Sequence, residues 1–186
     1  MSTCRKTQRI ICQTYFSASV LMSCQNANII AIPQAIKQQK HIYPSGKTSC
    51  IPFNTCRLHS EKLKQLNPDI VCVAPYSNIT TIKSYQKQKI PLLYTNAKNT
   101  IDGVLHEIEV LCSNMGYHQW GHILTQYIEL IIACCHNDVK RNKRQNDTLI
   151  LQKYQNTFYT FTNKHILMNI VNSLDINTLN QQNNSK

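Results

Sequence analysis

Two histidines four residues apart are the first candidates for metal chemistry in this sequence. His118 and His122 flank the segment Gln119-Trp120-Gly121. Residues four apart on a helix share one face, so both imidazoles could bind a single metal ion. The glutamate of the zinc-protease motif is absent and no third ligand is evident, whereas structural zinc sites use four. We therefore expect exposed polar histidines at the start of a helix and predict no metal site.

Cys134-Cys135-His136 is a second cluster of potential ligands. Successive helical residues point about 100° apart, so these three side chains cannot close on one metal ion and ordinary packing is expected. The 9 cysteines include no Cys-x-x-Cys pair, which argues against a zinc ribbon and a thioredoxin motif. Cys72 and Cys112 lie in apolar runs and are expected to be small buried residues. Free thiols in this number favour a reducing compartment.

The segment 44–49, Pro-Ser-Gly-Lys-Thr-Ser, resembles part of a phosphate-binding loop. That motif requires a glycine five positions before its Gly-Lys-Thr, and His41 stands there instead. No apolar strand leads directly into the segment and no clear helix follows it. Phosphate binding is therefore not predicted here.

No arrangement typical of an enzyme stands out elsewhere. No Ser/His/Asp or Cys/His set suggests nucleophilic catalysis, and the 9 acidic residues show no pairing for acid–base work. We therefore predict a protein that is not an enzyme and has no cofactor.

Positive charge dominates the sequence, with a formal net charge of +11 at pH 7. Most lysines and arginines stand singly. The run Lys140-Arg141-Asn142-Lys143-Arg144 is dense, and it falls where a long helix should end, a position at which the helix dipole favours cations. Nucleic-acid binding by this run stays open as an alternative.

The elements that must position any site follow from apolar periodicity. A hydrophobic share of 42% suffices for a packed core. Continuous apolar runs predict strands at 9–13, 29–32, 70–74 and 91–94. Helical spacing predicts helices at 16–24, from Ser60 through Leu66, from Ser77 or Asn78 through Tyr85, and from Asn99 or Thr100 to a cap at Gly116. This alternation predicts parallel βαβ units with right-handed crossovers.

The remaining segments are predicted as follows. Residues 34–57 are polar and irregular and read as a long loop. A single helix covers 118–143 with one apolar stripe of Ile123, Leu124, Tyr127, Ile128, Ile131 and Ile132. Strands follow at 147–154 and 158–162, and a helix at 166–174. The predicted fold class is α/β: a mostly parallel sheet with helices on both faces, then a long connecting helix, then a β-β-α remnant.

One stretch carries a resemblance to a known family. "LKQLNPDIVCV" and the following "IKSYQKQKIPLLYT" resemble the helix–Pro-Asp–strand signature, next helix and next strand of ABC-importer solute-binding proteins. "TIDGVLHEIEVLCSNMGYHQWGHILTQY" is similar to the helix, glycine turn and start of the backbone helix in that family. The group in question is the helical-backbone type that carries metal chelates such as iron-siderophores, haem or cobalamin. Both flanks agree with it.

The resemblance implies two α/β lobes joined by a rigid helix, with a chelate bound between the lobes and delivered to an ABC permease. It implies an N-terminal lobe at 1–117, a connecting helix at 118–143 and a C-terminal lobe at 144–186 that is cut short. Clefts of this kind use aromatic side chains on loops that follow strands. The expected ligand-binding residues are Tyr15, Phe16, Tyr43, Phe53, Tyr76 and Asn96.

The resemblance also implies a periplasmic or cell-envelope location, peripheral to the membrane at most. The stretch between Arg9 and Cys24 is a poor signal-peptide core because Gln13, Thr14, Ser17 and Ser19 interrupt it. A cytoplasmic location is expected if the gene is truncated. Family members often carry an acid near Asn78–Thr81 for the permease, and none stands there. A truncated lobe acting as an interaction protein without transport is the alternative function.

Overall fold

The computed structural model describes residues 8–38, 48–55, 60–96, 99–142, 151–154, 157–160, 170–171 and 174. Contacts divide the chain into two compact units, Met1–Asn96 and Ala97–Lys186, each of which is described by itself. The lobe boundaries expected at 117 and 143 stay a prediction. None of the helices in the described ranges is long and apolar enough to cross a membrane.

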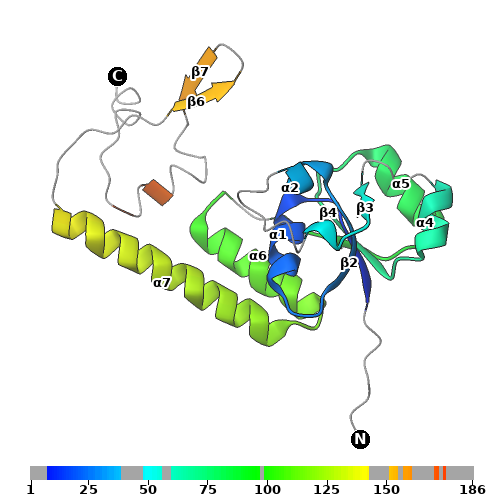
Figure 1. Ribbon diagram of the computed structural model, residues 1–186, viewed down its shortest axis with the longest axis horizontal. Coiled ribbons are helices and arrows are strands. Elements are labelled where there is room, and N and C mark those ends of the chain that lie inside the picture. The colour runs from blue at the N-terminus through cyan, green and yellow to red at the C-terminus, as the bar shows by residue number, and fades with distance from the viewer. Residues whose placement is uncertain are drawn as a thin grey trace, which may run out of the picture. The chain divides into compact units, whose positions relative to one another are not determined.

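The first unit is built on a five-stranded parallel sheet (Figure 1). Its strands are β1 (Arg9–Cys12), β2 (Asn28–Ile32), β3 (Phe53–Asn54), β4 (Ile70–Val73) and β5 (Leu92–Tyr94), in the order β3-β2-β1-β4-β5. The central pair aligns Ile10 with Ile70 and Ile11 with Val71. Burial on both faces explains why β1, β2 and β4 read as continuous apolar runs and not as alternating patterns. The predicted α/β fold with a parallel sheet is confirmed.

Helices cover both faces of this sheet, as Figure 1 shows for α1 against α4 and α5. They are α1 (Tyr15–Ser23), α2 (Gln34–Gln38), α4 (Ser60–Leu66) and α5 (Ile79–Lys87). Leu63 and Leu66 of α4 and Tyr85 of α5 form one core cluster with alternate sheet residues. The right-handed crossover rule places α1 on the other face, because β1 leads to β2 in the opposite direction from β4 to β5.

The prediction of one long irregular loop at 34–57 is wrong. The structure shows α2 directly after Pro33, with Ile36 buried, and the edge strand β3, which pairs with Ala31 and Ile32 of β2. The Lys37 ammonium donates a hydrogen bond to the carbonyl of Ile51. Two paired residues and a five-residue polar helix leave no periodic signal, so this part of the fold is decided by the neighbouring strand. Residues 39–47 lie outside the described ranges.

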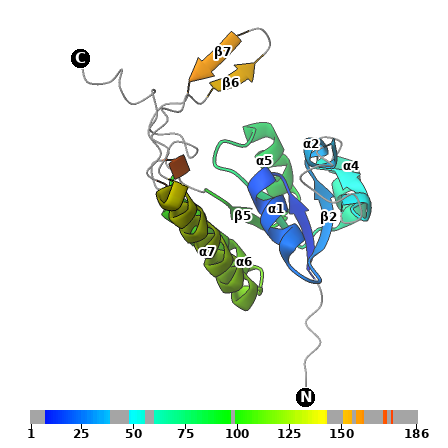
Figure 2. The same ribbon diagram turned by 60° about the vertical axis from the view of Figure 1, so that its left-hand side comes forward.

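The second unit contains an antiparallel pair of helices, visible side by side in Figure 2. They are α6 (Ile101–Asn114) and α7 (His118–Asn142). Thr100 caps α6 by accepting a hydrogen bond from the Gly103 backbone at 3.1 Å. Gly116 follows α6 with φ 78°, a left-handed conformation that suits glycine after a helix. The predicted cap and the predicted long helix are both confirmed.

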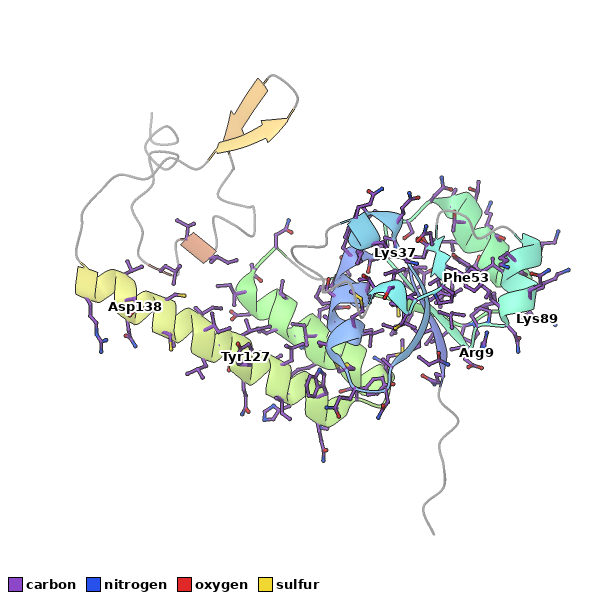
Figure 3. All side chains as sticks on the ribbon, in the orientation of Figure 1. Arg9, Lys37, Phe53, Lys89, Tyr127 and Asp138 are labelled. Atoms are coloured by element: carbon purple, nitrogen blue, oxygen red, sulfur yellow. The ribbon has the colours of Figure 1, made fainter. Side chains whose placement is uncertain are left out.

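The single apolar stripe predicted for α7 is wrong in its extent. Leu124, Ile128 and Ile132 are half-buried, whereas Ile123, Tyr127, Leu130 and Ile131 are exposed. Figure 3 labels Tyr127 on this helix. Cys134 and Cys135 are exposed as well, contrary to the expected packing. Residues four apart lie on nearly the same side of a helix, whereas adjacent residues point about 100° apart. The predicted stripe contains adjacent pairs such as Ile131 and Ile132, so it spans more of the helix surface than one contact with α6 can bury.

The C-terminal part is described only in pieces. β6 (Leu151–Tyr154) and β7 (Thr157–Thr160) form an antiparallel hairpin, which confirms the two strands there. Ile170 and Val171 are helical, inside the helix predicted for 166–174. Residues 147–150, 161–169 and 175–186 lie outside the described ranges.

The contact of α6 with α7 predicts one sharp substitution. A Cβ atom on Gly121 would lie 2.7 Å from the Cβ of Cys112 and 3.6 Å from the Glu109 Cα. We expect Gly121→Ala to lower the free energy of unfolding by about 1–3 kcal/mol, because the added methyl group overpacks the contact. This loss should outweigh the gain from the higher helix propensity of alanine. Gln126→Ala, an exposed change on the same helix, should stay within about 0.5 kcal/mol. Urea unfolding followed by circular dichroism measures both, and equal stabilities would contradict the close contact.

Candidate functional site

The carboxyl ends of all five strands meet at one edge of the sheet, because the strands are parallel. From the centre, β1 leads through α1 to β2, and β4 leads through α5 to β5 in the opposite direction. The chain therefore has a topological switch point between β1 and β4. Open α/β sheets bind their ligands in the crevice outside the strand ends at such a point.

Backbone hydrogen bonds fix the segments that leave this edge. The Gln13 N–H donates to the Cys72 carbonyl at 2.9 Å, and the Thr95 N–H donates to the Val73 carbonyl at 2.8 Å. The Ala74 N–H donates to the Ser77 hydroxyl at 3.0 Å, which closes the turn after β4. The loops after β1, β4 and β5 thus start from a rigid ladder.

Aromatic residues gather at this edge of the sheet. Tyr15, Tyr76 and Tyr94 are exposed by 47%, 87% and 48%. Phe16 stands half-buried in the first turn of α1, and Asn96 is exposed just after β5. The predicted residues Tyr15, Phe16, Tyr76 and Asn96 therefore all follow strands at the carboxyl edge. Contact of any of them with a ligand stays a prediction.

Tyr94 was missed in the sequence. It is the last residue of β5 and reads there as part of an apolar strand, Leu92-Leu93-Tyr94. The apolar pattern of the sequence did not indicate that its side chain is exposed at the strand end. It adds a third tyrosine to the edge.

The predicted residue Phe53 does not join this group. Phe53 lies in β3 and packs against the core cluster, with the Lys62 ammonium 4.6 Å from its ring centre. Figure 3 labels Phe53 beside the sheet. Its ring therefore has a cation–π partner and a packing role. Tyr43 lies outside the described residues.

The Gln13 and Tyr85 side chains meet beneath the switch point. The Gln13 side-chain amide donates a hydrogen bond to the Tyr85 hydroxyl, which joins the end of β1 to α5. Tyr85 is fully buried, and burial raises the pKa of its hydroxyl, while the bond from Gln13 lowers it. A buried tyrosine hydroxyl needs such a partner, so this pair ties the loop before Tyr15 to the core.

Cys12 and Cys72 lie opposite one another at the ends of the central strands. Both are free and fully buried. The hydrogen bond with Cys72 and then burial hold the pKa of the Cys12 thiol well above its usual range. The Cys12 thiol is therefore neutral, and both cysteines pack as small residues within the sheet, as expected for Cys72.

Helix N-termini give the edge a positive character. Thr14 caps α1 by accepting a hydrogen bond from the Ser17 N–H at 3.0 Å, and Asn78 caps α5 through the Thr80 N–H at 2.8 Å. Neither helix has an acidic side chain in its first turn. No acidic side chain of either first turn offsets the partial positive charge of these helix dipoles, which suits a ligand that carries anionic groups.

The histidine motif lies elsewhere, at the start of α7. The His118 and Ser113 side chains lie 3.2 Å apart (Nδ1 to Oγ), and His122 Nδ1 lies 3.7 Å from the Glu109 carboxylate. Both histidines are exposed, as predicted. In the described residues, no three His, Cys, Asp or Glu side chains are grouped so as to hold a metal ion.

The basic run begins in the last turn of α7, which ends at Asn142, so the expected helix end is confirmed. Lys143 and Arg144 lie outside the described residues.

Comparison with known proteins supports the fold. No protein-family model matches the sequence, and no curated protein does either. Solved structures do match, at 10–21% sequence identity in the examples compared. A "possible" iron-binding (periplasmic solute-binding) protein of Staphylococcus epidermidis matches with a TM-score of 0.75 and 15% identity, over 93% of this chain and 67% of the other.

Two further structures agree. FhuD2 of Staphylococcus aureus matches with a TM-score of 0.72 and 21% identity, over 94% of this chain and 66% of its own. The periplasmic heme-binding protein RhuT of Roseiflexus matches with a TM-score of 0.70 and 17% identity, over 90% and 64%. The chain thus has the fold of periplasmic solute-binding proteins, and the resemblance read from the sequence is confirmed at that level. It spans about two thirds or less of their length.

The buried hydroxyl of Tyr85 predicts a measurable effect. Tyr85→Phe leaves the Gln13 amide without its acceptor, so we expect a loss of about 1–2 kcal/mol in the free energy of unfolding. The control Tyr94→Phe removes an exposed hydroxyl and should change it by less than about 0.5 kcal/mol. Because the folded pKa of Tyr85 is raised, its contribution is complete below about pH 10 and falls as the pH rises further. Tyr85→Phe should make that fall smaller and leave the part that the buried Cys12 thiol contributes, and an unchanged pH dependence would contradict the assignment.

Cysteine accessibility gives a separate prediction. Iodoacetamide at pH 8 should label the exposed Cys50, Cys134 and Cys135 in the native protein. Cys12 and Cys72 should be labelled only after unfolding, since they are buried and the Cys12 thiol resists ionisation. Peptide mass spectrometry distinguishes the sites. Labelling of Cys12 at the rate of Cys134 would show that the central strands are not packed as described.

Proposed function

We propose that this chain is the ligand-binding lobe of a solute-binding component of an ABC importer. It captures a metal chelate, a siderophore, haem or cobalamin complex, at the carboxyl edge of its sheet and delivers it to a permease. The observation that carries the proposal is the position of three exposed tyrosines, Tyr15, Tyr76 and Tyr94, at the carboxyl ends of strands on both sides of the switch point. Matching structures include proteins named for iron and heme binding.

The chemistry of this edge supports a chelate as the ligand. Aromatic rings offer broad apolar faces to a porphyrin, a corrin or the catechol rings of a siderophore. The two helix N-termini offer N–H groups and positive potential to the carboxylates or oxyanions that such ligands carry. The edge therefore combines stacking surfaces with anion recognition.

The proposal extends to the whole protein. We propose a lobe at 1–117, a connecting helix at 118–143 and a second lobe from 144, with the chelate between the lobes and the protein in the periplasm or cell envelope. Permease docking through an acid at the start of α5 is not part of the proposal, because that turn carries none.

Thermal unfolding in the presence of candidate ligands tests the proposal. The purified chain is titrated with haem, cyanocobalamin and a panel of ferric siderophores. A ligand that binds only the native state adds about 2.7 kcal/mol of stability at 100 times its Kd. We expect a saturable rise in Tm with one class of compound.

Matched variants locate the site. Tyr76→Ala should weaken binding by about fivefold or more, the equivalent of about 1 kcal/mol from one aromatic contact. Tyr127→Ala, an exposed tyrosine of α7 that follows no strand, should leave the Kd unchanged. A cooperative transition that no compound shifts would refute chelate capture by this chain and favour the interaction-protein alternative.

A further inference from the structure

A recess lies at the amino-terminal edge of the sheet, opposite the carboxyl edge. Its volume is about 430 Å³, and it opens between the C-terminal ends of α4 and α5. Pro68 and Ile90, which line it, lie two positions before the first residues of β4 and β5. We call this recess the anion groove. It is separate from the carboxyl edge, where the three tyrosines lie.

Among the described residues, two lysines and no acidic residue line the anion groove. Lys64 comes from the last turn of α4 and Lys87 from the last turn of α5. The carboxylate nearest in sequence is Asp69, and its Oδ2 accepts a hydrogen bond from the Arg9 N–H at 2.7 Å. No lining carboxylate is available to neutralise the two lysines.

Helix dipoles offset only part of this charge. Each helix C-terminus contributes about half a negative charge, so two lysines leave a net charge of about +1. Other donors already bind carbonyl groups at these helix ends. Arg9 Nε donates to the Leu66 carbonyl at 2.9 Å, and the Lys89 N–H closes α5 on the Gln86 carbonyl at 2.9 Å. Figure 3 labels Arg9 and Lys89. Neither lysine of the groove is therefore needed as a helix cap.

The side chain of Gln88 carries a buried donor without a hydrogen-bond partner. Its Nε2 atom is buried and bonds to no acceptor among the described residues. Gln88 itself lines the groove beside Lys87. An unsatisfied buried amide N–H costs about 1–3 kcal/mol, and an oxygen of a bound ligand would supply the missing acceptor.

We propose that the anion groove binds a small organic anion whose carboxylate or phosphate lies between Lys64 and Lys87. The Gln88 amide donates to an oxygen of the same group. Leu63 and Ile90 form an apolar wall that contacts the carbon part of the ligand. The first unit of the chain would then bind two ligands, the chelate at its carboxyl edge and a small anion in the anion groove.

Nuclear magnetic resonance of the labelled full chain tests this proposal. Benzoate, phenyl phosphate and inorganic phosphate are titrated at constant ionic strength, with sodium chloride as the reference salt. We expect a saturable shift of the Gln88 side-chain amide with an organic anion, and the three compounds distinguish a carboxylate from a phosphate site. Shifts no larger than those with chloride would overturn the proposal.

Charge variants supply the control. Lys64→Gln with Lys87→Gln should weaken binding at least tenfold, and Gln88→Leu should weaken it as well. Lys83→Gln removes the same charge from an exposed position of α5 outside the groove lining and should have little effect. Equal weakening by Lys83→Gln and by the double variant would show that general charge attraction, and not a site, holds the anion. Unchanged amide spectra of the free variants establish that each is folded.

Discussion

The pairing of β1 with β4 is the contact on which the first unit depends. These two strands lie at the centre of the sheet, and apart from Arg9 and Ile70 their residues are buried. Chain segments leave the pair in opposite directions, so its geometry creates the switch point and places the loops after Cys12 and Val73 side by side. The Asn67-Pro68-Asp69 turn prepares the pairing, because Asp69 both accepts from and donates to the backbone of Arg9.

The same arrangement gives the two edges of the sheet different chemistry. Helix N-termini and exposed tyrosines meet at the carboxyl edge, whereas helix C-termini with last-turn lysines meet at the amino edge. A parallel sheet enforces this asymmetry, since every crossover helix runs antiparallel to the strands. The proposed chelate site and the proposed anion groove are thus two consequences of one topology.

The second unit obeys a simpler constraint. Gly121 lets α7 approach Cys112 of α6 closely, and the half-buried stripe of α7 follows from that contact. The exposed residues Ile123, Tyr127, Leu130 and Ile131 form another side of the helix, which one helix partner cannot cover. The sequence pattern merged both sides into one stripe because it records spacing and not the width of a contact.

Local signals in the sequence determined most of the elements. Continuous apolar runs located four strands of the sheet, Asn78 and Thr100 marked helix starts, and Gly116 marked a helix end, because buried strands and helix caps are recorded in neighbouring residues. Only the tertiary structure shows that β3 is a strand, because it forms by pairing with β2. Only the tertiary structure shows that Tyr94 is exposed, because its exposure comes from its position at the end of β5. It also decided that Phe53 packs under Lys62 and that Gln13 meets Tyr85, 72 residues further on. Such contacts join residues of different strands, helices and loops, so no local pattern of residue types within one element can specify them.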